Sequence, residues 1–314
     1  MTPGPRPSPL SFLPSPPING FHLGPLFIHF YGLMYVIGIT LAIYIARRRL
    51  AAAGENPELI GSVAVWAVVA GIIGGRIYFD ITTPQDIQPG WYGPFAVWSG
   101  GLGIWGGVAA GALAGAWRLR RLGGSIPIFM DAVAPTLLVA QAIGRIGNYF
   151  NQELFGRPSG LPWALMIDPA HRPPGYQGYA TFQPTFLYEM IFDLAFAGML
   201  VWLGHHTRVR SPGLFALYVT GYSAFRIFEE SLRIDSSEHF LGLRLNFYVA
   251  SVLTVAGLIW FVITQRRKPA SAGPDAPPGA GVSAVAAAAT GSQSRSGETT
   301  ARDQPGDTAA TAAG

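Results

Sequence analysis

Long apolar segments constrain this chain more than any other feature. Seven of them extend over roughly 20 residues, the length that a helix needs to cross the hydrocarbon core of a bilayer. They lie at about 26–46, 59–79, 95–117, 125–145, 184–204, 213–233 and 243–264. Only 12% of the residues are charged, about half of the fraction that is usual in soluble domains. The sequence therefore predicts an all-α integral membrane protein with about seven transmembrane helices.

Basic residues cluster at one side of the predicted spans. They close the first, third and seventh spans and separate the fifth from the sixth: Arg47, Arg48, Arg49, Arg118, Arg120, Arg121, Arg208, Arg210, Arg266, Arg267 and Lys268. Cytoplasmic loops of membrane proteins carry an excess of Lys and Arg. This pattern predicts an N-terminus outside and a cytoplasmic C-terminus. The same placement argues against nucleic-acid binding, although the net charge is +4.

Composition divides the chain into three parts. Residues 1–25 are rich in proline and predict a periplasmic N-terminal segment without the features of a signal peptide. Residues 26–264 form the predicted transmembrane domain. Residues 265–314 consist mainly of Ala, Gly, Pro, Ser and Thr, which predicts a disordered cytoplasmic tail. The chain contains no cysteine, so disulfides and thiolate metal sites are excluded, and we expect neither a metal nor a cofactor.

Three arginines lie inside the predicted spans, namely Arg76, Arg145 and Arg226. A charge within a span is costly, so each is a candidate functional residue. At about 1.5 Å per helical residue, all three fall in the outer half of the membrane. The same level holds further polar and aromatic side chains: Tyr31, Trp105, Glu189, Glu229 and Glu230. Because arginine donates paired hydrogen bonds to phosphate, this level predicts a site for a phospholipid headgroup.

The segment GRIGNYFNQELFGR, residues 144–157, concentrates hydrogen-bonding side chains where the fourth span ends. Arg145 and Asn148 are three residues apart and share one helix face. Gly147 between them permits another helix to approach. The alternative interpretation is a helix cap with an interfacial arginine.

The sixth span contains a second polar ladder. Tyr222, Arg226 and Glu230 follow one another at intervals of four residues, so they share one helix face. The alternative interpretation is structural, with Glu230 only neutralising Arg226.

The segment GLGIWG at 101–106 matches the glycine pattern of dinucleotide-binding loops. That motif requires a preceding strand within a soluble βαβ unit, whereas this segment lies in an apolar span. Its glycines favour close helix packing or the approach of a substrate.

Four segments in this order resemble the bacterial prolipoprotein diacylglyceryl transferases: FYGLMY at 30–35, GRIGNYFNQELFGR at 144–157, QPTFLYE at 183–189 and YSAFRIFEESLR at 222–233. The resemblance covers roughly residues 10–265. It implies transfer of the sn-1,2-diacylglyceryl group of phosphatidylglycerol to the lipobox cysteine thiol of a prolipoprotein signal peptide. The products would be a thioether and glycerol 1-phosphate. It also implies a multi-pass protein of the bacterial inner membrane, with its active site toward the outer leaflet and no cofactor.

The resemblance assigns roles to single residues. Arg145 and Arg226 match the family's essential arginines, and we expect them to clamp the phosphate. The predicted catalytic residues are Arg145, Arg226, Glu153, Glu230 and Tyr31. The predicted substrate-binding residues are Asn148, Tyr222, Arg76, Gly156, Trp105 and Gln183.

Two positions depart from the family's pattern. Trp105 stands where much of the family has the histidine of an H-G-G segment, and Gln183 replaces a second familiar histidine. An indole cannot accept a proton. We expect either Glu153 or Glu230 to act as the base, or the arginine-rich surroundings to activate the substrate thiol without one. His29 lies near the outer surface, but on a different helix face from Tyr31, and is interpreted as structural or interfacial.

Other functional classes fit the sequence less well. A secondary transporter would also bury arginines and carboxylates, but transporters usually gather them near the midplane. An intramembrane protease would need a serine–histidine pair, paired aspartates or a zinc set, and none of these motifs is visible. A scaffold without activity would not require four ordered motifs.

Overall fold

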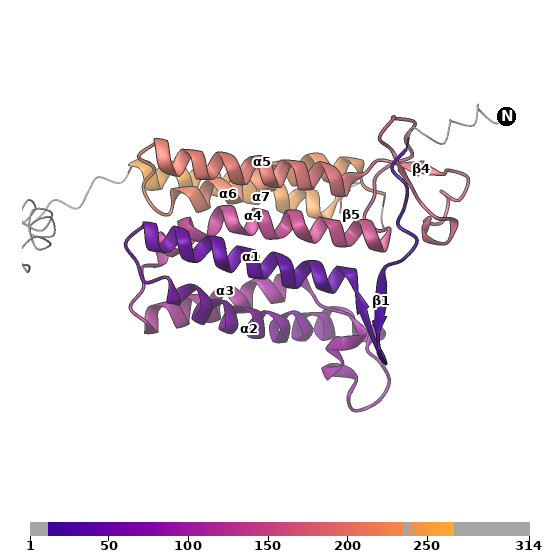
Figure 1. Ribbon diagram of the computed structural model, residues 1–314, viewed down its shortest axis with the longest axis horizontal. Helices are drawn as coiled ribbons and strands as arrows, with labels where there is room; N and C mark the ends of the chain where they lie inside the picture. Colours follow the sequence, from indigo (N-terminus) through magenta and orange to yellow (C-terminus); the bar gives the residue numbers. More distant parts are fainter. Residues whose placement is uncertain (1–11, 235–238, 241–242, 267–314) are drawn as a thin grey trace, which may run out of the picture. The chain divides into compact units, whose positions relative to one another are not determined.

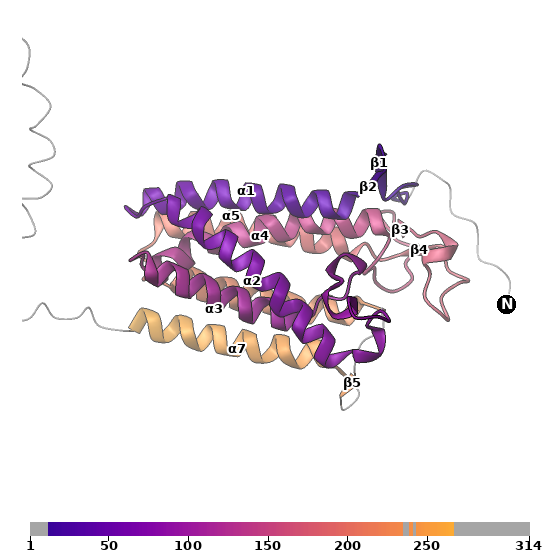
Figure 2. The same ribbon diagram turned by 90° about the horizontal axis from the view of Figure 1, so that it is seen from below.

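The computed structural model describes residues 12–234, 239–240 and 243–266. In this part of the chain seven α-helices dominate: α1 (Phe30–Ala52), α2 (Glu58–Thr82), α3 (Ile104–Arg121), α4 (Ile126–Asn151), α5 (Thr185–His206), α6 (Gly213–Leu232) and α7 (Leu245–Arg266). Five of them, α1, α2, α4, α5 and α7, are long and apolar enough to cross a membrane. The helices run side by side in Figures 1 and 2. This is the architecture of a multi-pass integral membrane protein.

The two remaining helices are less apolar for identifiable reasons. α3 has only 18 residues and ends in Arg118, Arg120 and Arg121. α6 carries Arg226 and two neighbouring glutamates in its last two turns. Both helices nevertheless pack within the bundle, α3 against α2 and α6 against α4, α5 and α7.

The polarity of the helices gives the bundle two distinct ends. At the arginine-rich end, α1, α3 and α7 finish with Arg49, Arg121 and Arg266 in their last turns. At the opposite end, which we call the site end, α2, α4 and α6 finish and α1, α3, α5 and α7 begin. Figure 1 shows the labelled strands gathered at the site end.

These strands make the prediction of an all-α protein incomplete. Three two-stranded antiparallel sheets form at the site end: β1 (Gly20–Leu23) with β2 (Leu26–His29), β3 (Leu165–Met166) with β4 (Thr181–Phe182), and β5 (His239–Phe240) with β6 (Leu243–Arg244). Residues 26–29 were predicted to begin the first span. They instead pair with β1, in the register Leu23↔Leu26 to Gly20↔His29, and α1 begins only at Phe30.

The predicted start of the third span, at residue 95, was also wrong, because α3 begins only at Ile104. Residues 95–103 are not part of α3, because this stretch contains the last residue of one short 3-10 helix (Gly93–Phe95), a second 3-10 helix (Val97–Ser99) and a glycine-rich turn. Gly100 and Gly101 have φ angles of 87° and 77°, a left-handed conformation that interrupts a helix. The fourth span is longer than predicted, since α4 continues to Asn151. Most of the predicted C-terminal tail, residues 267–314, lies outside the described residues.

Glycines allow α2 and α3 to approach closely, as the GLGIWG segment predicted. A Cβ atom on Gly106 would lie 2.3 Å from the carbonyl oxygen of Gly74, and one on Gly111 would lie 2.9 Å from that of Ala67. This small-residue contact leaves α2 and α3 as a tightly packed pair.

The long connection between α4 and α5 has its own small core. Phe155, Leu165, Ile167 and Phe182 are buried together, and Leu13 packs against them. The β3–β4 pairing of Leu165 with Phe182 closes this segment. The connection is thereby a folded unit that covers the site end beside α4 and α5.

Candidate active site

Glu189, in the first turns of α5, is the centre of an ion-pair network between three helices. Its side chain is fully buried. Arg145 on α4 places Nη2 2.8 Å from Glu189 Oε1 and Nε 2.8 Å from Oε2. From α6, the hydroxyl of Tyr222 donates to Oε1 at 2.9 Å, and Arg226 Nη1 lies 3.5 Å from Oε2. One carboxylate therefore holds the two predicted phosphate-binding arginines side by side.

Arg226 is surrounded by carboxylates. Besides Glu189 it contacts Glu229, and its Nη2 donates to Glu230 Oε1 at 2.7 Å. The other oxygen of Glu230 lies 2.7 Å from Nε of Arg244, at the end of β6. The predicted face of α6 is thus confirmed, and Glu230 links Arg226 to a further arginine from the neighbouring hairpin.

The two central arginines are accessible although their partners are not. The side chains of Arg145 and Arg226 are 18% and 17% exposed, whereas that of Glu189 is 0% exposed. The carboxylates pair with the guanidinium groups and orient them. The two arginines thus keep some exposed surface, whereas the carboxylate of Glu189 keeps none.

A chain of side-chain hydrogen bonds continues from Arg145 to Glu153. Arg145 Nη1 donates to Asn148 Oδ1 at 3.0 Å, and Asn148 Nδ2 donates to Glu153 Oε1 at 2.8 Å. Asn151 Nδ2 donates to the same oxygen at 3.2 Å. Gln152 adopts the left-handed conformation with φ 51°, so α4 ends there and the chain turns back, with Glu153 N donating to Asn148 O at 3.1 Å. The end of the helix therefore brings Glu153 to Asn148.

Tyr31, in the first turn of α1, lies against α4 at Gly147. A Cβ atom on Gly147 would stand 2.5 Å from Tyr31 Cδ2, so only glycine permits this approach. The Tyr31 hydroxyl shares a hydrogen bond of 3.0 Å with that of Tyr35. Gly147 directly precedes Asn148, which belongs to the chain of hydrogen bonds from Arg145 to Glu153. The structure thus brings Tyr31 to the edge of the network.

Gly156 and Gln183 join the connection between α4 and α5 to the helices around the site. Gly156 N donates to Gln183 O at 2.9 Å, and a Cβ atom on Gly156 would lie 3.0 Å from the Leu232 carbonyl oxygen. The Gln183 side chain accepts a hydrogen bond of 2.6 Å from the Tyr188 hydroxyl. Both residues hold the loop in place; neither hydrogen-bonds to Glu189 or the two arginines in the described part of the chain.

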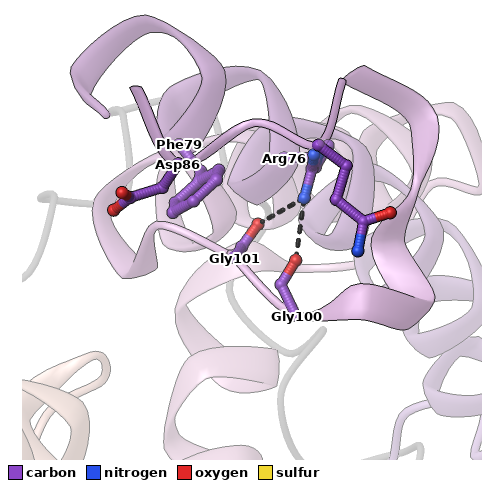
Figure 3. Close-up of a pocket in the computed structure, with 6 residues that line it drawn as sticks. Arg76, Phe79, Asp86, Gly100 and Gly101 are labelled. Carbon is purple, nitrogen blue, oxygen red and sulfur yellow. Dashed lines mark hydrogen bonds between the residues drawn. The ribbon is translucent and has the colours of Figure 1, made fainter. Parts of the chain in front are cut away.

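Arg76 and Trp105 lie on the α2–α3 pair. Arg76 donates to backbone carbonyl groups of the loop before α3 and forms an ion pair of 3.1 Å with Asp80. Figure 3 shows its guanidinium pointing at the carbonyl groups of Gly100 and Gly101. Trp105 is in the first turn of α3 and is 45% exposed. Among the described residues, no hydrogen bond or ion pair joins Arg76 or Trp105 to the Glu189 network.

A cavity of about 270 Å³ opens beside Arg76. It is lined by Arg76, Phe79, Asp86, Gln88, Gly100 and Gly101. It is separate from the Glu189 network, since none of its lining residues belongs to that network.

Sequence reasoning placed Glu189 and Glu229 at the correct level but did not include them among the site residues, and it missed Arg244. The signal for Glu189 was present, because a carboxylate within an apolar span is as costly as an arginine. Arg244 is the last residue of the short strand β6, and nothing in its local sequence indicates that it meets Glu230. In the part of the chain that the structure describes, no cluster of three or more His, Asp or Glu side chains is arranged to hold a metal ion.

Comparison with known proteins adds independent evidence. A family model described as prolipoprotein diacylglyceryl transferase matches residues 19–263. The chain is 47% identical over 259 residues to a phosphatidylglycerol–prolipoprotein diacylglyceryl transferase of Frankia alni, covering 81% of this chain and 68% of the relative. It is 47% identical over 258 residues to the enzyme of that name from Cutibacterium acnes, with 81% and 87% covered. It is 43% identical over 265 residues to transferase 2 of Streptomyces coelicolor, with 83% of each chain covered.

Proposed function

Because this chain belongs to the prolipoprotein diacylglyceryl transferase family, we propose that it transfers the diacylglyceryl group of phosphatidylglycerol to a prolipoprotein. The acceptor is the thiol of the lipobox cysteine in the signal peptide, and the products are a thioether and glycerol 1-phosphate. The observation that carries the proposal is the pair of accessible arginines, Arg145 and Arg226, held by one buried carboxylate. Family membership does not favour the alternative of a secondary transporter.

The arginine pair fits the charge that develops in this reaction. The thiol sulfur forms a bond to a glycerol carbon of the lipid while the bond from that carbon to the phosphate oxygen breaks. Negative charge then grows on the departing phosphate. Guanidinium groups fixed in advance stabilise this charge more in the transition state than in the ground state. Arg145 and Arg226 would thus clamp the phosphate, with Glu189 setting their separation.

The thiol must also lose its proton. Of the two carboxylates that the sequence predicts as base, Glu230 is bound by Arg226 and Arg244. The hydrogen bonds of Glu153 come from two neutral amides, those of Asn148 and Asn151. Glu153 is therefore the carboxylate less committed to ion pairs, and we assign the proton of the thiol to it.

The other predicted residues would serve the substrates less directly. Asn148 orients Arg145 and Glu153, and Tyr222 orients Glu189. Tyr31 borders the site from α1, and Gly156 and Gln183 shape the loop above it. Arg76 and Trp105 belong to the α2–α3 pair, and no hydrogen bond or ion pair of the described residues joins them to the Glu189 network. Their roles in binding the lipid therefore stay predictions.

The orientation in the membrane follows from the two ends of the bundle. The arginine-rich end would face the cytoplasm of a bacterial inner membrane, with all seven helices crossing it. The site end would then lie at the outer leaflet, with residues 1–25 in the periplasm and the tail from residue 265 in the cytoplasm. Residues 26–264 would form the catalytic domain. In this proposed orientation Arg145 and Arg226 would lie at the level of the outer headgroups.

A direct assay tests the proposal. The purified protein in nanodiscs with phosphatidylglycerol would receive a signal peptide with a lipobox cysteine, and both glycerol phosphate release and the peptide's mass gain would be followed. We expect both signals with the cysteine peptide and neither with its serine variant. Arg145→Ala should abolish them, whereas Arg47→Ala, at the arginine-rich end, should not. A folded wild-type protein that releases no glycerol phosphate would refute the proposal.

A further inference from the structure

The loop between α2 and α3 exposes large aromatic side chains. Trp91 is 86% exposed, Trp98 is 77% exposed and Phe95 is 69% exposed. Apolar side chains of this size, so close together in sequence and left uncovered, mark a surface that contacts something other than water. The loop contains the three short 3-10 helices Pro84–Asp86, Gly93–Phe95 and Val97–Ser99.

The aromatic side chains continue an apolar surface of α2. Ile73, Ile77 and Ile81 are all exposed and follow one another at intervals of four residues, so they form one stripe along a candidate membrane span. The helix ends at Thr82, directly after Ile81, and the loop begins there. The surface that faces lipid along α2 therefore leads directly to the loop.

Arg76 fixes the backbone on both sides of the exposed Trp98. Its Nη2 and Nε donate to the carbonyl groups of Gly93 at 2.6 Å and Pro94 at 2.9 Å. Its Nη1 donates to Gly100 at 2.7 Å and Gly101 at 3.2 Å. All three nitrogens of the guanidinium are thus occupied, and the side chain is only 7% exposed.

Two further features hold the same turn. Ala96, between the two groups of carbonyls, is completely buried and pins the middle of the loop against the protein. Gly101 has φ 77° and lies against the ring of Phe79, where a Cβ atom would be 2.6 Å from the nearest ring carbon. The loop is therefore held by Arg76, Ala96 and Gly101, while the side chains of Trp91, Phe95 and Trp98 stay exposed.

We propose that this loop is a bilayer-anchoring surface, in which Arg76 holds the backbone so that Trp91, Phe95 and Trp98 enter the headgroup layer of the phospholipid membrane. Indole rings are favoured at this depth because one edge is polar and the rest is apolar. Arg76 acts here as a positioning residue, because its guanidinium donates to carbonyl groups on both sides of Trp98. The inference concerns membrane contact, so it stands or falls independently of the proposed transferase activity.

Because the chain has no cysteine, a single introduced cysteine can carry a spin label at a defined position. Trp91→Cys and Trp98→Cys would be labelled in phospholipid nanodiscs, and collision with oxygen, which dissolves in lipid, would be compared with collision with a water-soluble nickel chelate. Val65→Cys, exposed on α2, serves as the lipid reference. Gly178→Cys serves as the water reference, because a side chain there meets no other atoms within 4 Å.

We expect the label at 65 to favour oxygen and the label at 178 to favour the nickel chelate. The labels at 91 and 98 should lie between these two references and be clearly less accessible to nickel than the label at 178, because the headgroup layer is only partly hydrated. In the Trp98→Cys background, Arg76→Gln and Arg76→Lys should make the label several-fold more accessible to nickel and more mobile. The label at 65 should stay unchanged in both Arg76 variants, which shows that the bundle remains folded.

Three results would overturn the inference. Labels at 91 and 98 as accessible to nickel as the label at 178 would place the loop in water. Unchanged mobility of the label at 98 in both Arg76 variants would remove the positioning role. Protection that appears only when a lipobox peptide is added would assign this surface to the peptide substrate instead of the bilayer.

Discussion

Glu189 receives Arg145 through two nitrogens at once, with Nε and Nη2 each 2.8 Å from a different carboxylate oxygen. This bidentate pairing fixes both the position and the plane of the guanidinium. The carboxylate is fully buried and the arginine is not. Glu189 therefore determines how Arg145 is presented at the site end.

Glu189→Gln should strongly reduce the transferase activity, although glutamine keeps the size and shape of the glutamate side chain. The amide of glutamine has only one oxygen that can accept a hydrogen bond. Arg145 therefore loses one of its two hydrogen bonds to residue 189, and both Arg145 and Arg226 lose their ion pair with it. We expect kcat/KM to fall by about 100-fold or more, the scale for removing one preorganised electrostatic group. Enzyme kinetics and lipid binding would be measured together. Glu58→Gln, which breaks a surface ion pair with Arg47, is the control and should leave kcat/KM unchanged. Wild-type kinetics in Glu189→Gln would refute the orienting role.

Glu153→Gln tests the proton acceptor. The glutamine keeps the side-chain length but cannot take a proton, so we expect kcat to fall by roughly 10²–10⁴-fold, as for a general base. Binding of phosphatidylglycerol should change little, because the contacts of Glu153 are with Asn148 and Asn151. The rate would be measured with saturating peptide across a range of pH. Activity close to wild type would instead favour a thiol that is activated without a dedicated base.

Gly147→Ala should destabilise the contact between α1 and α4. The new methyl group would lie 2.5 Å from Tyr31 Cδ2 and 3.2 Å from the Tyr31 Cα atom, so the helices must separate. Overpacking of this kind costs about 1–3 kcal/mol. Thermal unfolding in detergent provides the measurement. Gly144→Ala, one turn earlier on α4, meets no atom within 4 Å and should leave Tm unchanged or slightly raised. Equal Tm values for the two variants would contradict this packing.

Asp193→Leu should stabilise the protein. Asp193 lies one turn after Glu189, is fully buried, and neither of its carboxyl oxygens has a hydrogen-bond partner among the described residues. Burial of a polar group without a partner is unfavourable, and its replacement by an apolar side chain of similar shape should gain about 1–3 kcal/mol. The free energy of unfolding and kcat/KM would be compared with wild type. A large loss of activity with unchanged stability would show that the carboxyl group takes part in the reaction.

The sequence alone was sufficient to predict which residues share one face of a helix. The spacing of Tyr222, Arg226 and Glu230 predicted a common face of α6, and the structure confirms it. Gly147 was predicted to admit another helix, which proves to be α1. Both inferences rest on the helical period, which depends only on residues within a few turns of one another.

The apolar spans, the clustered arginines and the helical faces were determined by the sequence itself, because span length and periodicity are local properties of the chain. Only the tertiary structure decided which groups meet. Glu189 lies 44 residues from Arg145 in the chain, and Arg76 binds carbonyl groups 17 to 25 residues further along. These partners are selected by how α4, α5 and α6 pack and by the turn that Gly100 and Gly101 permit. A buried charge must find a partner, but the identity of that partner follows from contacts between helices, which no single segment contains.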